Sequence, residues 1–423
     1  MPLLRTFTPA LHPASPDKMH ELRTCHSCLP RMPKRRLMTP GPTQVPESAR
    51  LALARQVGHH RTPEFRALFG EVLDGLKYVF QTSGDVIVLA CSGTGAMEAA
   101  VVNVVPRGGQ AIVIEAGVFA RRWSDICRAF GIDVVAYEVP WGEAADPTRI
   151  KQLLNEHPDA VAVFGTLMES STGVGHDVEA LGRAVRATKA IFVVDAISGA
   201  GVMECRTDDW GIDVLVVGSQ KSLMLPPGLG FVAVGGKAWE QIDHHPAQAF
   251  YFDLKQYRKK LHDGPDTPFT PAHTLVAALA ESLQIIRSQG IENVWARANV
   301  LAAATRAGVQ ALGLTIFAKR PASGLTAVEF PAGVNGSEFL KSLETRFGVK
   351  LAGGQGHLKG KIFRVAHLGM IDELDVLSTL AAIELVLLEL GQQVQFGAAV
   401  AAASRVLADA HRSGQFPASP PVS

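Results

Sequence analysis

Residues 191–195 read IFVVD and residues 214–221 read VLVVGSQK, and these two stretches decide the fold. Each begins with four apolar residues, a length that suits a β-strand. Neither alternates with polar residues, which is typical of a strand covered on both faces. The first run ends in Asp195, and Lys221 closely follows the second. We therefore expect two buried strands with chemically active side chains just beyond their last residues.

Similar apolar runs, separated by helical patterns, occur along the chain on both sides of these two stretches. Further apolar runs of strand length are residues 86–90, 111–115, 160–164 and 231–234, and helical patterns between the runs include residues 96–105, 121–130 and 178–188. Strands that alternate with helices predict an α/β fold with a mostly parallel sheet and right-handed crossovers. In such sheets ligands bind at the carboxyl ends of the strands.

Length and composition predict more than one domain. The chain has 423 residues, 47% of them hydrophobic and 19% charged, which is enough to bury a large interior. After about residue 285 the pattern changes to a long helix through residues 292–312 and then to short strand and helix signals. We expect a disordered extension (1–37), an arm with the large domain (38–285), a small α+β domain (286–390), and a helix with a tail (391–423).

Charge and cysteine usage narrow the class of protein. The net charge is +1, so the chain offers no strong basic field to nucleic acid or to an anionic membrane. No apolar run reaches the roughly 18–20 residues that span a bilayer. Cys91, Cys127 and Cys205 are isolated, which indicates reduced thiols and a cytoplasmic location. Cys25 and Cys28 have CxxC spacing but no second pair, so we expect no metal site.

A glycine-rich loop follows the first apolar run. Residues 91–95 read CSGTG, and a helical pattern begins near residue 96. Glycines let the backbone approach an anion, and the N-terminus of the next helix offers free N–H groups. The loop is therefore a candidate phosphate cradle. It is equally consistent with a tight turn that has a threonine cap.

Asp195 and Lys221 lie 26 residues apart, one strand–helix unit, so both can reach one site. Such an acid ordinarily caps a turn, and such a lysine is ordinarily solvated. Pyridoxal 5′-phosphate (PLP) gives both a purpose. A carboxylate keeps the pyridine nitrogen protonated, and a buried lysine with a lowered pKa serves as nucleophile and proton carrier. Residues 169–173, ESSTG, would offer hydroxyls to a ring substituent.

In this order the motifs resemble class V aminotransferases of PLP fold type I, in the alanine–glyoxylate and serine–pyruvate branch. The resemblance runs from about Met38 to Leu390. Its further markers are TPGP at 39–42, HRTPEF at 60–65, TPFTP at 267–271, and Arg364. It implies a large domain whose mostly parallel seven-stranded sheet lies between helices, plus a smaller α+β C-terminal domain.

The resemblance also implies roles for individual residues. Lys221 would attach the cofactor and Asp195 would pair with its ring nitrogen, both as catalytic residues. The other cofactor-binding residues would be Ser92, Gly93, Thr94, Phe119, Ser170, Ile197, Gln220 and Thr270. Arg364 would bind the substrate α-carboxylate, and Gly41 would line the entrance. Thr270 would reach the phosphate of a neighbouring subunit, which predicts a homodimer with shared active sites.

Two of these assignments have a structural alternative. Phe119 could be an ordinary core phenylalanine instead of the residue that stacks on the cofactor ring. Residues 62–64 read equally well as a helix start, with a threonine cap and a proline in the first position, which leaves His60 and Arg61 without a definite role.

The implied activity moves the amino group of alanine or serine to glyoxylate or pyruvate by a ping-pong Schiff-base mechanism. Cysteine desulfurases share the fold but need a cysteine in the C-terminal half, and none follows Cys205. A 2-aminoethylphosphonate–pyruvate aminotransferase, or another class V PLP enzyme, stays open because the cofactor site would be the same. A non-catalytic subunit of another complex would need neither Lys221 nor Asp195.

Overall fold

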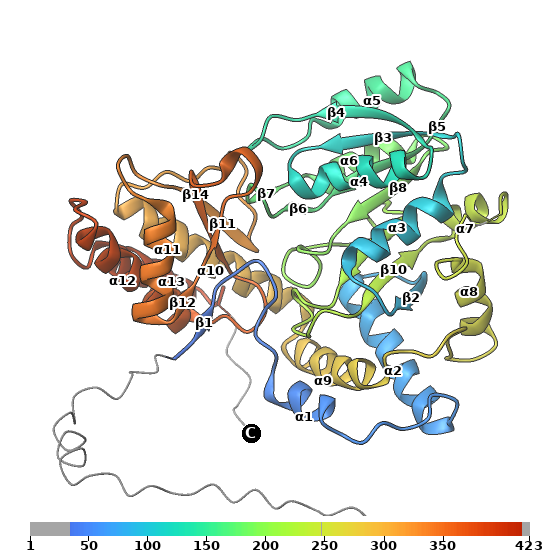
Figure 1. Cartoon of the computed structure of the whole chain (residues 1–423), viewed down its shortest axis with the longest axis horizontal. Coiled ribbons are helices and arrows are strands. Elements are labelled where there is room, and N and C mark those ends of the chain that lie inside the picture. Colours follow the sequence, from blue (N-terminus) through green and yellow to red (C-terminus); the bar gives the residue numbers. More distant parts are fainter. Residues whose placement is uncertain (1–33, 247, 417–423) are drawn as a thin grey trace, which may run out of the picture. The chain divides into compact units, whose positions relative to one another are not determined.

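The computed structural model describes residues 34–246 and 248–416, and its largest feature is a seven-stranded sheet (Figure 1). The strands are β2 (Asp85–Leu89), β3 (Gln110–Glu115), β4 (Asp133–Glu138), β5 (Ala160–Thr166), β8 (Ile191–Asp195), β9 (Val214–Gly218) and β10 (Gly230–Val234). Their order across the sheet is β2-β10-β9-β8-β5-β3-β4. Every neighbouring pair is parallel except the two that include β10. The predicted α/β class and mostly parallel seven-stranded sheet are confirmed.

Two strands differ from the sequence expectation for physical reasons. The edge strand β4 was not predicted, because residues 133–138 are partly exposed and carry charges at both ends. Strand β10 is antiparallel because only residues 219–229 connect it to β9, too few for a crossover helix. That short connection contains Lys221, so the reversal keeps the lysine at the edge where β9 ends.

Helices cover both faces of this sheet, which explains why its strands are apolar throughout. One face packs on α2 (Pro63–Phe80), α5 (Pro147–Glu156), α6 (Val178–Arg186) and α9 (His273–Gln289), and the other on α3 (Gly93–Val104), α4 (Val118–Ala129), α7 (Gly236–Asp243) and α8 (Leu254–His262). Along β8, Phe192 and Val194 enter the first core, whereas Ile191 and Val193 enter the second.

A second group of elements follows α9. The strands β11 (Leu325–Glu329), β14 (Ile362–Ala366) and β13 (Ala352–Gly353) form an antiparallel sheet in the order β11-β14-β13. The helices of this group are α10 (Ile291–Ala311), α11 (Gly336–Phe347), α12 (Glu373–Glu389) and α13 (Ala398–Arg412). Residues of β11, β14 and the four helices form a separate apolar core.

The predicted domain boundaries stay predictions, since the chain from Arg35 onward forms a single compact unit. The N-terminal arm is part of that unit, because β1 (Arg36–Leu37) pairs in parallel with β12 (Val349–Lys350) and α1 (Glu47–Leu53) follows it. Most of the expected extension, including Cys25 and Cys28, lies outside the described residues.

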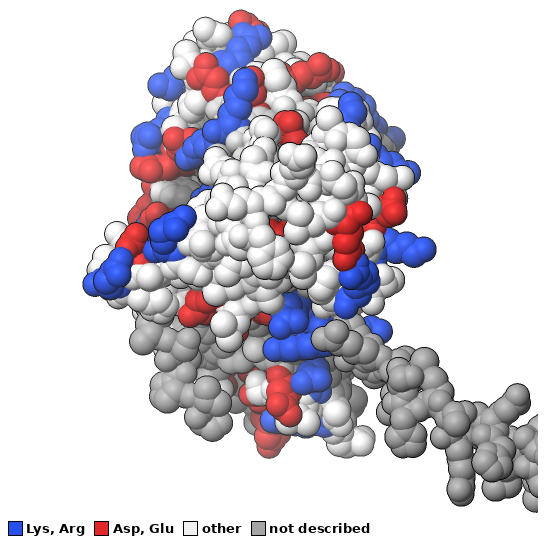
Figure 2. Space-filling view, turned by 90° about the vertical axis from the view of Figure 1, so that its left-hand side faces the viewer, with Lys and Arg blue, Asp and Glu red and all other residues white. Residues whose placement is uncertain are grey.

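The surface drawn in Figure 2 has a broad central area of uncharged residues, with basic and acidic side chains intermixed around it. Within residues 34–246 and 248–416, no helix combines the length and the apolar character needed to cross a membrane.

Candidate active site

Several strands of the large sheet end or begin at one edge, which brings the predicted motifs together. Gly230 of β10 pairs with both Gly218 of β9 and Leu89 of β2, and Asp195 of β8 pairs with Val216 of β9. The segments that follow β2, β3, β5, β8 and β9 enclose a cavity of ≈ 110 Å³. Its lining residues are Ser92, Gly93, Thr94, Phe119, Arg122, Met168, Ser170, Asp195, Ile197, Ser198, Gln220 and Lys221. All predicted cofactor-binding residues except Thr270 therefore line one cavity.

The loop before α3 has the geometry of an anion site. Ser92 is the N-cap of α3, and its Oγ accepts a hydrogen bond from the Gly95 N–H at 3.4 Å. The sequence analysis gave a tight turn with a threonine cap as the alternative interpretation of this loop. The capping residue is instead Ser92. Within the described residues, the N–H groups of Gly93 and Thr94 have no protein acceptor. A Cβ at Gly93 would lie 2.7 Å from Ile197 Cδ1, so a side chain there would require Ile197, another cavity residue, to shift.

Asp195 is buried, with 5% of its surface exposed. Its Oδ1 accepts the Ile197 N–H at 2.8 Å, so the acid does cap a turn. Its other oxygen has no protein donor among the described residues and can accept from a ligand. Burial raises the pKa of Asp195 to about 7, opposed by the Ile197 hydrogen bond. Capping and ligand binding are thus compatible in this one side chain.

Lys221 lies in the same cavity and is largely buried. Its Nζ donates to the carbonyl oxygen of Pro40, and no carboxylate in the described chain forms an ion pair with it. Burial lowers the pKa of Lys221 to about 8, while the Asp195 charge opposes this shift. Gly41 lies against the lysine with φ +112°, and a Cβ there would be 2.4 Å from Lys221 Cδ. A side chain at position 41 would therefore displace the lysine.

Arg364, on β14, lies in an adjoining cavity of ≈ 420 Å³. This cavity shares Phe119, Ser170 and Lys221 with the first one and also includes Gly41. Phe119 is only partly buried and borders both cavities, which favours a ligand contact over a core role.

The Arg364 side chain is buried but not neutralised. Its Nε donates to the Gly353 carbonyl at 2.9 Å and its Nη1 to the Ser170 carbonyl at 2.7 Å. Burial lowers the pKa of Arg364 to about 10, and the Glu169 charge opposes this effect. No carboxylate among the described residues pairs with it, so the guanidinium can bind an acid from outside the protein.

The hydroxyl-rich segment after β5 is divided between two tasks. Ser170 borders both cavities. The Ser171 hydroxyl instead donates to the buried Glu169 carboxylate at 2.6 Å. Glu169 also accepts the Ala120 N–H at 2.8 Å, and burial raises its pKa. This acid therefore fixes the start of α4, and with it the position of Phe119.

Arg122 is a cavity residue that the sequence analysis did not identify. It lies on α4 three residues after Phe119, and its Nη1 donates to the Thr94 Oγ1 at 3.0 Å. Arg122 lies within a helix and not directly after a strand. The available signal was the i, i+3 spacing from Phe119, which places both side chains on one side of a helix.

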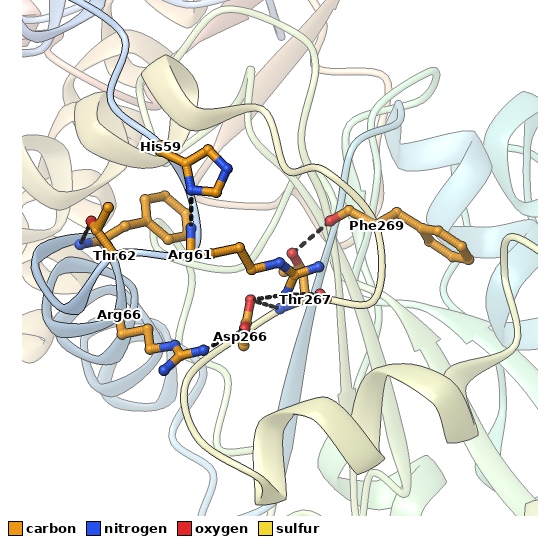
Figure 3. Close-up of polar contacts among 8 residues, drawn as sticks. His59, Arg61, Thr62, Arg66, Asp266, Thr267 and Phe269 are labelled. Atoms are coloured by element: carbon orange, nitrogen blue, oxygen red, sulfur yellow. Dashed lines mark hydrogen bonds and ion pairs between the residues drawn. The ribbon is translucent and has the colours of Figure 1, made fainter.

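Thr270 and Arg61 lie outside the two site cavities. Thr270 is exposed and borders neither of the two site cavities. The segment just before it is held by Arg61, whose Nη1 lies 2.6 Å from Asp266 Oδ1 and 2.9 Å from the Thr267 carbonyl oxygen (Figure 3). Thr62 caps α2 and proline occupies its first turn, which confirms the helix-start interpretation of residues 62–64.

Comparison with known proteins agrees with this geometry. The family model described as Aminotransferase class-V matches residues 47–367. A soluble hydrogenase small subunit from Synechococcus sp. (strain PCC 6716) is 42% identical over 383 residues, covering 89% of this chain and 99% of the relative. A serine–glyoxylate aminotransferase from Methylorubrum extorquens is 34% identical over 384 residues, covering 88% and 95% respectively.

Among solved structures, the ureidoglycine–glyoxylate aminotransferase from Bacillus subtilis has a TM-score of 0.84 and 29% identity. The match covers 89% of this chain and 98% of that one. The fold and the site define a PLP-dependent transferase of fold type I. The chain belongs to the class V aminotransferase family, and the predicted family, enzyme class and cofactor are confirmed.

The residues present fit this cofactor. The two free N–H groups of Gly93 and Thr94 match a phosphate, and the free oxygen of Asp195 matches a protonated ring nitrogen. Gln220 also borders the cavity, and its side-chain NH₂ group is a donor that suits a phosphate oxygen.

Proposed function

We propose that this enzyme transfers the amino group of a small amino acid, such as alanine or serine, to a small 2-oxo acid, such as glyoxylate or pyruvate. The observation that carries the proposal is the unpaired Arg364 guanidinium in a cavity that also contains Lys221. A planar guanidinium suits the α-carboxylate that amino and oxo acids share. In a ping-pong reaction both substrates would use this contact in turn.

PLP, when bound, supplies an electrophilic carbon and an electron-withdrawing ring. Ser92, Gly93, Thr94 and Gln220 would hold its phosphate, while Ile197 and Phe119 would contact the ring and Ser170 its hydroxyl. Asp195 would keep the ring nitrogen protonated. These assignments are supported by the shared cavity.

Lys221 has two tasks in this proposal. Its amine would attach the cofactor, which requires the neutral form that burial favours. Once substrate has replaced it, Nζ would take the proton from the α-carbon of the donor and pass it to the cofactor. In the second half-reaction the reverse transfer would protonate the α-carbon of the acceptor. The Pro40 carbonyl and the Gly41 backbone lie against this side chain and would limit its movement.

A homodimer would complete the site. Thr270 is exposed beside the aromatic residues Phe250 and Tyr251, which are 77% and 37% exposed. A second copy of the chain could cover these rings while receiving Thr270 near its cofactor phosphate. A cytoplasmic location is supported by the free thiols of Cys91, Cys127 and Cys205.

The lining of the ≈ 420 Å³ cavity that contains Arg364 disfavours a phosphonate donor. Apart from Arg364 and Lys221, its basic lining residue is Lys350, which is neutralised by Glu344 at 2.5 Å. A dianionic phosphonate would need a further free cation. A purely non-catalytic role as a subunit of another complex is disfavoured, because Lys221, Asp195 and Arg364 border two adjoining cavities and leave a complete reactive arrangement.

The test is a panel of half-reactions followed through the cofactor spectrum. Alanine, serine, aspartate and 2-aminoethylphosphonate are offered separately as donors, and glyoxylate and pyruvate as acceptors. Rapid conversion by alanine or serine, reversed by glyoxylate or pyruvate, is expected. A clear preference for the phosphonate would contradict the substrate assignment while leaving the cofactor site intact.

A further inference from the structure

The side chain of Arg122 connects two parts of the cofactor cavity that lie on different elements. Its guanidinium carbon lies 5.1 Å from the centroid of the Phe119 ring, within the range of a cation–π contact. Its Nη1 donates to Thr94 Oγ1 at 3.0 Å, in the first turn of α3. The side chain is thus oriented by two residues that themselves border the cavity.

The positive charge of Arg122 is not neutralised. No carboxylate of the described chain lies within ion-pair distance of it. The neighbouring Arg121 behaves differently, because its Nε lies 3.2 Å from Glu115 Oε2 and 57% of its side chain is exposed. A partly buried cation that borders a cavity without an acid partner needs an anion from elsewhere.

We propose that Arg122 is an additional cofactor-binding residue, whose guanidinium binds the phosphate group of PLP and is oriented for this by Phe119 and Thr94. The proposal rests on the PLP site described above. Thr94 marks where the phosphate would lie, because its N–H and that of Gly93 are unpaired there. Five N–H donors in a planar fork let Arg122 keep its contact with Thr94 and still donate to an anion.

The charge of Arg122 also acts on the reactive pair. Burial is the largest influence on both groups, raising the pKa of Asp195 and lowering that of Lys221. The Arg122 charge lowers both pKa values, so it opposes burial at Asp195 and adds to the effect of burial at Lys221. This agrees with a cation that faces the cavity interior.

The test compares two ligands that differ only in the phosphate, PLP and pyridoxal. Each is titrated into cofactor-free protein, and its dissociation constant is measured by absorbance. Arg122→Ala should weaken PLP by about 10- to 100-fold, the usual cost of losing a charged hydrogen bond. Pyridoxal should change by less than about 3-fold, and Arg122→Lys should recover part of the PLP affinity. Inorganic phosphate should compete with PLP less well in Arg122→Ala than in the parent.

Arg121→Ala is the matched control, since it removes the adjacent arginine outside the cavity and should leave both dissociation constants unchanged. If Arg122→Ala does not fold, as judged by thermal melting, Arg122→Gln carries the same comparison. Unchanged PLP affinity, or equal losses for PLP and pyridoxal, would overturn the proposal. Failure of the parent protein to bind PLP at all would instead contradict the proposed function.

Discussion

Two clusters of charged residues in this protein differ in whether their charges are paired within the protein. In the first, Arg61 and Arg66 both pair with Asp266, at 2.6 Å and 3.3 Å (Figure 3). In the second, Lys221, Asp195 and Arg364 border adjoining cavities, and none of them forms an ion pair within the described chain. Paired charges hold segments of chain together, whereas buried unpaired charges destabilise a protein unless a ligand completes them.

The pKa shifts follow the same division. Burial alone would raise the pKa of Asp266, but hydrogen bonds from Arg61, the Thr267 N–H and Arg66 hold it below its ordinary value. Burial dominates at Asp195 and raises its pKa to about 7. The first acid is stabilised in its charged form by the protein itself. The second needs a cationic partner, and a protonated pyridine ring supplies one.

The largest expected effect comes from Lys221→Ala. Without the amine, the protein loses its covalent anchor and its proton carrier, so turnover should fall by at least about 10³-fold. The visible absorbance of the bound cofactor should disappear with it. Lys189→Ala, which removes an exposed lysine, serves as control. Normal turnover in Lys221→Ala would contradict the assignment of Lys221 as covalent anchor and proton carrier.

Asp195→Ala should reduce the rate more than the cofactor affinity. The phosphate contacts and Lys221 remain, but the ring nitrogen loses its carboxylate partner. We expect turnover to fall by about 10³-fold. The dissociation constant of PLP should change much less. Equal turnover in Asp195→Ala and the parent would show that this acid only caps its turn.

Arg364→Ala should weaken the donor and acceptor half-reactions together, because both substrates present an α-carboxylate. Truncating such a contact typically costs ~2–5 kcal/mol, roughly 30- to several-thousand-fold in kcat/KM. Single-turnover measurements with alanine and with glyoxylate check both directions. A loss confined to one half-reaction would assign Arg364 to one substrate only.

The lowered pKa of Lys221 predicts a pH dependence for cofactor uptake. Only the neutral amine attacks PLP, so the uptake rate of cofactor-free protein should rise with pH through a midpoint near 8. Asp195 raises this pKa against the larger effect of burial, so Asp195→Asn should move the midpoint to lower pH. Stopped-flow absorbance measures the profile. A midpoint that stays near the ordinary lysine value would contradict the burial of the amine.

The smallest effect is expected at the paired cluster. Asp266→Asn should lower the free energy of unfolding at neutral pH by about 1–2 kcal/mol, because two ion pairs are lost. Since the folded pKa of Asp266 is lowered, its contribution is present above the ordinary value of 3.8 and disappears as pH falls below it. Urea unfolding of the parent and of Asp266→Asn should therefore show a smaller difference in the free energy of unfolding at pH 3 than at pH 7. A difference that grows on acidification would contradict the assignment.

The sequence predicted the parts of the site that lie at strand ends. Asp195 and Lys221 follow buried strands whose apolar pattern is unambiguous, so the sheet alone brings them together. Arg364 depended on the family resemblance, because nothing in the pattern of residues 361–365 places a second sheet beside the first cavity. Arg122 was not identified, and Glu169 was noted only as part of residues 169–173, since the roles of both depend on how α4 is positioned.

The central claim is that the unpaired amine of Lys221 is the attachment point of PLP. The direct measurement is borohydride reduction of the PLP-loaded protein, followed by proteolysis and mass spectrometry of the peptides. The account predicts one cofactor per chain, attached to the peptide that contains Lys221. Attachment to a different lysine, or no attachment under conditions where the protein transaminates, would contradict it.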